Sequence, residues 1–159
     1  MDGALLLKLL IVLATVVAME LLAFAVHKYV MHGWGWGWHR SHHEPRSGWF
    51  EKNDLYAVVF AALSLLFFTI AAQAVPLLYW VGVGMAAYGL LYAIVHDALV
   101  HRRFPFPRVG KRGYLKRLVQ AHRLHHAVRD RTGAVSFGFL YAPPVRRLKE
   151  ALREGQPGR

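Results

Sequence analysis

Three apolar runs dominate the pattern of hydrophobic and polar positions along this chain. The first extends from Ala4 to about Val26 and is interrupted only by Lys8 and Glu20. The second extends from about Leu55 to Ala74, and the third from about Leu77 to Val95. A helix needs roughly 20 apolar residues to cross the hydrocarbon core of a bilayer. Each run is long enough, so the pattern predicts three transmembrane helices.

Pro76 lies between the second and third runs. Because proline cannot continue a helix, it favours a tight turn between two spans over one helix of about forty residues, which a bilayer does not require. The last two spans should therefore form a helical hairpin, which returns the chain to the side of the membrane that it left. The segments after the first and third spans then lie on the same side.

The polar segments contain further predicted elements. Gly33–Trp38 alternates glycine with tryptophan, which is typical of a turn at the membrane–water interface, either as a simple aromatic belt or also as a lining for a substrate channel. Arg102–Pro107 should break the helix after the third span. Lys111–Val128 has the pattern of a basic amphipathic helix, and Tyr141–Pro144 predicts a turn before a short surface helix over Val145–Arg153.

Composition limits the chemistry of the chain. Its 159 residues fit a single domain over residues 1–159. It contains no cysteine, which excludes disulfides, thiolate zinc sites and cysteine-ligated haem or iron–sulfur clusters. Ala23-Phe24-Ala25 resembles the cleavage site of a signal peptide, but no lysine or arginine precedes Lys8 and cleavage would remove the helix before His27, so we expect the first run to be retained. We therefore expect a small all-α integral membrane protein.

Basic residues are concentrated in the C-terminal third. Fifteen of the 20 lysines and arginines lie after residue 100, and the formal net charge is +11. These stretches lack a known nucleic-acid motif, so we expect no nucleic-acid partner. The positive-inside rule explains the charge instead. We expect a protein of the inner (cell) membrane with its N-terminus outside and the chain from His101 onward in the cytoplasm, against anionic headgroups.

All ten histidines fall into four tight groups, in which HxxxxH and HxxHH spacings alternate. The groups are His27 and His32; His39, His42 and His43; His96 and His101; and His122, His125 and His126. Imidazole binds iron, zinc, copper and nickel, so metal ligation is a natural common cause. Ten ligands exceed what one ion accepts, whereas two metals with about five imidazoles each would use them all.

The two spacings predict different local geometries. Residues i, i+3 and i+4 lie within roughly 60° of one another around an α-helix, so each HxxHH box presents three imidazoles on one face. Residues i and i+5 are about 140° apart on an α-helix. The HxxxxH pairs should therefore lie at a helix end or on a π-bulge.

Two acidic residues accompany the predicted ligands. Asp97 lies inside the third group, where it either accepts a ring N–H and fixes the tautomer of a ligand, or pairs with Arg102 or Arg103. Glu20 lies seven residues before His27, on nearly the same helix face. A buried acid in a span is a functional candidate. Pairing with a neighbouring polar group is the favoured explanation for Glu20.

Several motifs around the histidines resemble those of a known family. They are Met31-His32-Gly33-Trp34, Ser41-His42-His43-Glu44-Pro45-Arg46, His96-Asp97-Ala98-Leu99-Val100-His101-Arg102-Arg103-Phe104-Pro105, Gln120-Ala121-His122-Arg123-Leu124-His125-His126-Ala127-Val128 and Val135-Ser136-Phe137-Gly138-Phe139. The boxes resemble the membrane fatty acid hydroxylase superfamily of non-haem di-iron oxygenases, which includes sterol desaturases. More closely, their flanks resemble the bacterial β-carotene hydroxylases, from about His27 to Pro144.

The resemblance implies hydroxylation of carbon 3 on the β-ionone rings of β-carotene, giving β-cryptoxanthin and then zeaxanthin. It also implies two iron ions held by the ten histidines, dioxygen as co-substrate and a substrate dissolved in the bilayer. The chain has no GxGxxG fingerprint of a nucleotide cofactor, so electrons must come from an external donor. We expect an acidic ferredoxin that docks on the basic face.

Two other functions remain open. A sterol or fatty-acyl hydroxylase or desaturase is the main alternative within the oxygenases. A histidine-rich metal transporter is the alternative from another class. A transporter needs ligands inside a transmembrane pathway, whereas these histidines follow the ends of the predicted spans. The expected architecture is thus about three transmembrane helices, with cytoplasmic interfacial helices that enclose a dimetal site.

Overall fold

The computed structural model describes residues 2–45, 48–105 and 109–155, and all regular structure in these segments is helical. Three helical stretches are long and apolar enough to cross a membrane: Gly3–Trp34, Asp54–Ala74 and Leu78–Val100. Within these stretches, 18-residue segments reach mean hydropathies of 2.7, 2.4 and 1.7. The prediction of an all-α membrane protein with three spans is confirmed.

Each span combines α-helical with π-helical turns. The first consists of α1 (Gly3–Ala25) and the π-helix η1 (Val26–Trp34). The second consists of α3 (Asp54–Leu66), the π-helix η2 (Phe67–Ala71) and α4 (Ala72–Ala74). The third consists of α5 (Leu78–Tyr92) and the π-helix η3 (Ala93–Val100). Outside the spans lie α2 (Trp36–His43), α6 (Tyr114–His125) and α7 (Val145–Gly155).

Large apolar side chains cover the outer faces of the spans. Leu13, Val17 and Leu21 of α1 are 62%, 63% and 67% exposed, an arrangement that suits lipid because such surface is unfavourable in water. Towards the interior the helices approach closely. A Cβ atom on Gly84 of α5 would lie 2.5 Å from Cβ of Thr15 in α1, so only a side chain as small as glycine's fits at this crossing.

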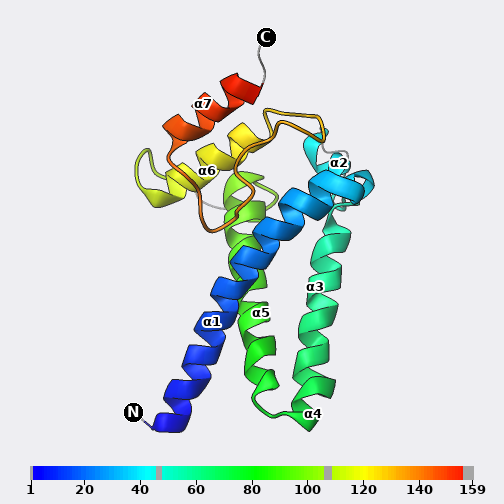
Figure 1. Cartoon of the computed structure of the whole chain (residues 1–159), viewed down its shortest axis with the longest axis vertical. Coiled ribbons are helices and arrows are strands. Elements are labelled where there is room, and N and C mark those ends of the chain that lie inside the picture. Colours follow the sequence, from blue (N-terminus) through cyan, green and yellow to red (C-terminus); the bar gives the residue numbers. More distant parts are fainter. Residues whose placement is uncertain (1, 46–47, 106–108, 156–159) are drawn as a thin grey trace.

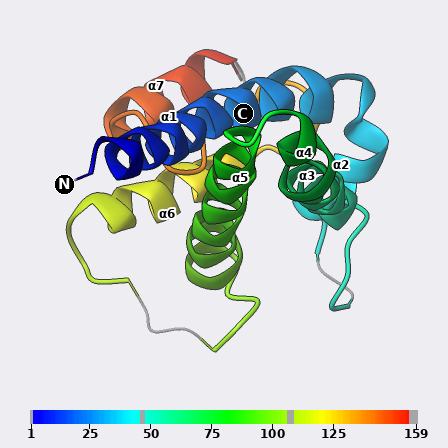
Figure 2. The same cartoon turned by 90° about the horizontal axis from the view of Figure 1, so that it is seen from below.

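The elements separate into two ends of the molecule. The N-terminus and the turn between α4 and α5 lie at one end, whereas α2, α6 and α7 lie at the other (Figure 1). The turn contains Pro76, as the sequence predicts. Seen from below, α1 runs across the hairpin formed by the second and third spans (Figure 2). The segments that carry the histidines are therefore on one side, as the even number of spans between them requires.

His27 and His32 lie on the π-helix η1, whereas His96 lies on the π-helix η3 and His101 is the residue that caps its end, so both predicted geometries occur. In η3, the His101 N–H donates to the His96 carbonyl oxygen at 2.9 Å. Such i→i+5 bonding brings residues five apart onto neighbouring turns of one face. The ring centroids are accordingly 4.5 Å apart for His96 and His101, and 5.4 Å apart for His27 and His32.

The chain turns sharply at the glycine–tryptophan repeat. η1 ends in a kink at Gly33, where φ is −111° and ψ is −126°. The Tyr56 hydroxyl donates to the Gly35 carbonyl oxygen at 2.9 Å, which ties the turn to α3. As predicted, the turn brings α2 back beside η1, so that the rings of His27 and His39 have centroids 4.8 Å apart.

The C-terminal helices differ slightly from their predicted bounds. α6 begins at Tyr114, three residues later than predicted, because Gly113 has a φ of 98°, which a right-handed helix does not allow. It ends at His125, three residues early. α7 packs on α6 through Leu148 and Ala121, near Val95 of η3. The predicted break after the third span is present at the end of η3, although residues 106–108 lie outside the described part of the chain.

Candidate metal centre

All ten histidines meet where η1, α2, η3 and α6 converge. Eight of them are buried, and His101 and His126 are partly buried. They divide into two adjacent groups of five, which we call cluster A and cluster B. Cluster A contains His27, His32, His39, His43 and His125, and cluster B contains His42, His96, His101, His122 and His126.

The Nε2 atoms of cluster A converge on one another. Nε2 of His39 lies 3.1 Å from Nε2 of His27 and 3.2 Å from Nε2 of His43. Nε2 of His32 lies 3.2 Å from Nε2 of His125. One ligand atom from each of His27, His32, His39 and His125 lies within 4.8 Å of all the others. Cluster A therefore has the dimensions of a metal site.

Cluster B converges in the same way. Nε2 of His122 lies 3.0 Å from Nε2 of His101 and 2.8 Å from Nε2 of His126. Nε2 of His42 lies 3.0 Å from Nε2 of His96. The two clusters adjoin where the rings of His43 and His126 stack, with centroids 4.5 Å apart.

Each HxxHH box contributes to both clusters, although its three histidines share one helix face. In α2, His39 and His43 belong to cluster A and His42 belongs to cluster B. The box at the end of α6 does the reverse, with His125 in cluster A, and His122 and His126 in cluster B. Each HxxxxH pair stays within one cluster. Each cluster therefore contains one HxxxxH pair and three histidines from the two HxxHH boxes.

Hydrogen bonds fix the tautomer of every histidine in cluster A. Their Nδ1 atoms contact oxygens that can only accept: His27 to Phe137 O at 2.8 Å, His32 to Arg131 O at 2.8 Å, His39 to Asn53 Oδ1 at 2.7 Å, His43 to Val128 O at 2.8 Å and His125 to Val135 O at 3.0 Å. Each Nδ1 therefore carries the proton, and each Nε2 keeps its lone pair.

Lone pairs that face one another at such distances repel unless a cation lies between them. Two imidazole nitrogens bound at a right angle to one ion, with bonds of about 2.1 Å, would be about 3.0 Å apart. The observed contacts of 2.8 to 3.2 Å agree with this spacing. The donor set of both clusters therefore fits metal ions.

Burial keeps the imidazoles neutral. Burial, assisted by repulsion from neighbouring imidazoles, lowers the pKa of His39 to about 3, that of His43 to about 4 and that of His126 to about 2. The same causes lower the pKa values of His42, His122 and His125 well below 6.5. At neutral pH, these lone pairs are therefore available for a metal.

A segment over residues 135–141, which we call the strap, closes cluster A. The ring of Phe139 stacks on that of His27, with centroids 5.1 Å apart and planes 10° apart. The strap is tightly constrained, because Ser136 has a φ of 61° and a Cβ atom on Gly138 would lie 2.6 Å from the Tyr141 carbonyl oxygen. The sequence motif Val135–Phe139 indicates this segment, but not its contacts with the histidines.

Glu20 anchors the strap to the first span. Its Oε1 atom accepts hydrogen bonds from the backbone N–H groups of Phe139, Leu140 and Tyr141, each at 3.0 Å. Its Oε2 atom accepts one from the Tyr88 hydroxyl at 2.8 Å. These four bonds satisfy a carboxylate that would otherwise be costly in a span. Pairing with neighbouring polar groups, the favoured sequence explanation, is what the structure shows.

Carboxylates support two histidines of cluster B. Nδ1 of His96 lies 2.8 Å from Asp97 Oδ1, and Nδ1 of His42 lies 3.0 Å from Glu51 Oε2. Asp97 also lies 4.0 Å from the Arg103 guanidinium, so both contacts considered for it are present, and the ring contact is the shorter. Sequence reasoning missed Glu51, because no regular spacing connects this loop residue with the histidines. It missed Asn53 behind cluster A for the same reason.

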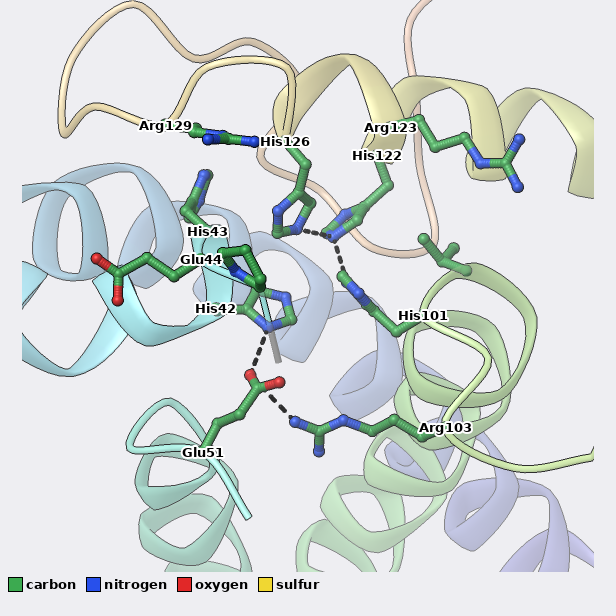
Figure 3. A pocket seen from close by; sticks show the side chains of 12 residues that line it. His42, His43, Glu44, Glu51, His101, Arg103, His122, Arg123, His126 and Arg129 are labelled. Atoms are coloured by element: carbon green, nitrogen blue, oxygen red, sulfur yellow. Dashed lines mark hydrogen bonds and ion pairs between the residues drawn. The ribbon is translucent and has the colours of Figure 1, made fainter. Parts of the chain in front are cut away.

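A polar cleft of about 390 Å³ lies beside cluster B (Figure 3). Its lining includes four histidines of that cluster together with Arg103, Arg123 and Arg129. Arg123 and Arg129 are exposed, whereas the Arg103 side chain is only 9% exposed and is held by acidic partners. The cleft therefore gives a polar approach mainly to cluster B, and to cluster A only at His43.

Comparison with known proteins assigns the chain to a family. The model of the fatty acid hydroxylase family matches residues 12–143, which include all ten histidines. The chain belongs to the fatty acid hydroxylase family. It is therefore a hydroxylase with membrane-spanning helices and histidine clusters that could hold metal, as the sequence motifs imply. No solved structure matches it significantly.

Several curated relatives align with most of this chain. A β-carotene hydroxylase of Pantoea ananas is 63% identical over 145 residues, which cover 91% of this chain and 83% of that protein. One from Paracoccus sp. (strain PC1) is 57% identical and covers 92% of this chain and 91% of that protein. The chloroplastic β-carotene 3-hydroxylase 1 of Arabidopsis thaliana is 39% identical over 80% of this chain and 42% of its own length. The resemblance stated from the motifs is confirmed.

Proposed function

We propose that this chain is a β-carotene 3-hydroxylase that converts β-carotene to β-cryptoxanthin and then to zeaxanthin at a di-iron centre. The observation that carries the proposal is the pair of five-histidine clusters in a chain 63% identical to a β-carotene hydroxylase over 91% of its length. Residues 1–159 would act as one membrane-embedded domain. Each hydroxylation consumes one dioxygen, two electrons and two protons, and it gives one hydroxyl group and one water.

All ten histidines are the proposed ligands, with one iron in cluster A and one in cluster B. Bound iron would supply dioxygen activation strong enough to attack an unactivated C–H bond, which acid–base groups alone cannot do. The Nδ1 hydrogen bonds in cluster A hold the rings so that each Nε2 lone pair points inward. This support lets the protein present the ligands without rearrangement.

Aromatic side chains would exclude water and orient the substrate at cluster A. Phe137 lies edge-on to both Phe24 and His27, with ring centroids 6.2 and 5.5 Å apart. Trp36 lies against His32 and His43. Such an apolar wall suits the β-ionone ring of a carotenoid that arrives from the bilayer. The nearby first span exposes apolar side chains, along which a hydrocarbon substrate could approach from the bilayer.

The polar cleft beside cluster B would face the electron donor. Exposed Arg123 and Arg129 suit an acidic protein such as a ferredoxin, because complementary charges steer association. We place this end of the molecule in the cytoplasm and the spans in the inner membrane, since the basic residues are concentrated at this end. The metal-transporter alternative is weakened because α2 and α6, which carry the HxxHH boxes, lie at one end of the bundle instead of along a pathway through it (Figure 1).

The decisive experiment is expression of the chain in a bacterium that already makes β-carotene, followed by chromatography of the pigments. We expect a monohydroxylated intermediate and then a product with one hydroxyl group on each ring, dependent on oxygen and iron. His122→Ala should leave β-carotene unconverted at equal protein levels. Altered sterols or acyl chains with unchanged carotenoids would indicate another lipid hydroxylase or desaturase. Metal uptake as the only change would favour a transporter.

A further inference from the structure

The two clusters differ in the groups that stand behind their histidines. All five Nδ1 atoms of cluster A contact neutral oxygens, four from backbone carbonyls and one from Asn53. In cluster B, the Nδ1 atoms of two histidines contact the carboxylates of Glu51 and Asp97. The histidine composition of the clusters matches, so this outer layer is where they differ.

Arg103 connects the two carboxylates of cluster B. Its Nη2 atom lies 3.2 Å from Glu51 Oε2, and its Nη1 atom lies 2.7 Å from Asp54 Oδ1 and 4.0 Å from Asp97 Oδ2 (Figure 3 shows the Glu51 contact). Three carboxylates therefore lie around this guanidinium within the described residues, and two of them contact histidines of cluster B. The four side chains are at most 18% exposed, so water screens them weakly.

A carboxylate that accepts the outer N–H of a ligating imidazole increases the basicity of the inner nitrogen and fixes the orientation of the ring. Nearby negative charge also stabilises a cation directly. Both effects act on cluster B through His42 and His96, whereas the acceptors of cluster A supply orientation without net charge. Two ions bound by equal numbers of imidazoles would then be held unequally.

We infer that Glu51 and Asp97, joined by Arg103, are positioning residues that make cluster B the more strongly electron-donating of two inequivalent metal sites. The inference rests on the proposed two-metal centre. Four of the five histidines of cluster B also line the polar cleft, whereas only His43 of cluster A does so. A metal ion in cluster B would therefore be the one whose higher oxidation state is better stabilised, and it would also be the ion nearer the polar cleft.

The test measures Co²⁺ binding by the full-length protein in detergent, in competition with a chromophoric chelator. His125→Ala serves as a background in which cluster B is intact, and His122→Ala as one in which cluster A is intact. Glu51→Gln keeps an oxygen acceptor but removes the charge. Asn53→Asp is the matched reverse change, because it places a carboxylate behind His39 of cluster A without altering the size of the side chain.

With cluster B intact, Glu51→Gln should weaken Co²⁺ binding about 10-fold or more, and Asn53→Asp should have little effect. With cluster A intact, Glu51→Gln should have little effect and Asn53→Asp should tighten binding. Asp97→Asn should repeat the Glu51→Gln result, which guards against misfolding of a single variant. In the ⁵⁷Fe-loaded wild-type protein, Mössbauer spectra should show two ferrous doublets, and Glu51→Gln should shift one of them.

The outcomes separate the inference from the proposed function. The wild-type chain could bind two Co²⁺ ions while Glu51→Gln changes the Co²⁺ affinity equally in the His125→Ala and His122→Ala backgrounds. That result would overturn the inequivalence of the two sites but leave the two-metal centre standing. No response to either carboxylate variant would do the same. A wild-type protein that binds fewer than two ions would overturn the two-metal centre and the inference with it.

Discussion

The ring of Phe139 lies parallel to that of His27, 5.1 Å away, although 112 residues separate them in the sequence. The contact depends on the strap, and the strap depends on Glu20, whose Oε1 atom accepts three consecutive backbone N–H groups. A carboxylate in the first span thus positions a segment near the C-terminus against the candidate metal centre.

Replacement of Glu20 by alanine should release the strap and reduce both hydroxylation and the metal content of cluster A. A hydrogen bond to a charged group contributes about 1.5 to 3 kcal/mol, so the loss of four should exceed any single loss. Tyr88→Phe removes only one of the four and should have a much smaller effect. Pigment conversion and bound metal per chain, measured on purified variants, check this order.

Glu20→Gln provides the conservative comparison, because its amide oxygen can still accept the three backbone bonds. It should restore most of the metal content that alanine loses. Gly138→Ala should resemble Glu20→Ala, since its Cβ atom would lie 2.8 Å from Glu20 Oε1, whereas Gly89→Ala meets no atom within 4 Å and serves as the control. Full metal content in Glu20→Ala would show that the strap does not depend on this carboxylate.

Iron content should fall in steps that follow the two clusters. The wild-type chain should bind two irons, and His125→Ala and His126→Ala should each bind about one, because each opens a different cluster. His42, His43, His125 and His126 should each be indispensable for activity. Elemental analysis of freshly purified protein tests this, with the exposed neighbour Gln120→Ala as control. Full activity of His125→Ala, or at most one tightly bound ion in the wild type, would contradict it.

The metal-free protein should lose stability as the pH falls from about 6.5 towards 4. Unfolded imidazoles take up protons near 6.5, whereas burial lowers the pKa of folded His43 to about 4 and that of His39 to about 3. Between these pH values, the unfolded state binds more protons than the folded state, so a fall in pH lowers the free energy of unfolding. Above about pH 6.5, these histidines no longer make the free energy of unfolding depend on pH. Thermal unfolding in detergent at several pH values checks the trend. His39→Gln should flatten it, and an unchanged slope would argue against the burial of this imidazole.

We expect the end of the helical bundle that carries the histidines to face the cytoplasm and the opposite end to face the outside of the cell. Single cysteines at Asp2 and Gln73 should react with an impermeant thiol reagent on intact cells, because these exposed positions lie at the end away from the histidines. A cysteine at Glu154, on α7, should be protected until the cells are opened. The reverse labelling pattern would place the histidine end outside the cytoplasm.

The sequence alone determined the spans, the hairpin and the identity of the histidine groups. Long apolar runs leave a chain little choice but to span a bilayer, and Pro76 fixes where the hairpin turns. The HxxxxH spacing also required a departure from α-helical geometry, and η1 and η3 provide it. These features depend on periodicity and composition, which are local and can be read directly.

The tertiary structure alone decided how the histidines are shared. His39 and His42 lie on one helix face, yet they join different clusters, because the partners that complete each cluster come from helices distant in sequence. The supporting groups are equally non-local: Glu51 stands behind His42, and the Phe137 carbonyl oxygen behind His27. A backbone carbonyl oxygen is present in every residue, and a single acidic residue in a loop forms no repeating pattern. The sequence therefore does not indicate which histidines these groups orient, and only the folded chain shows it.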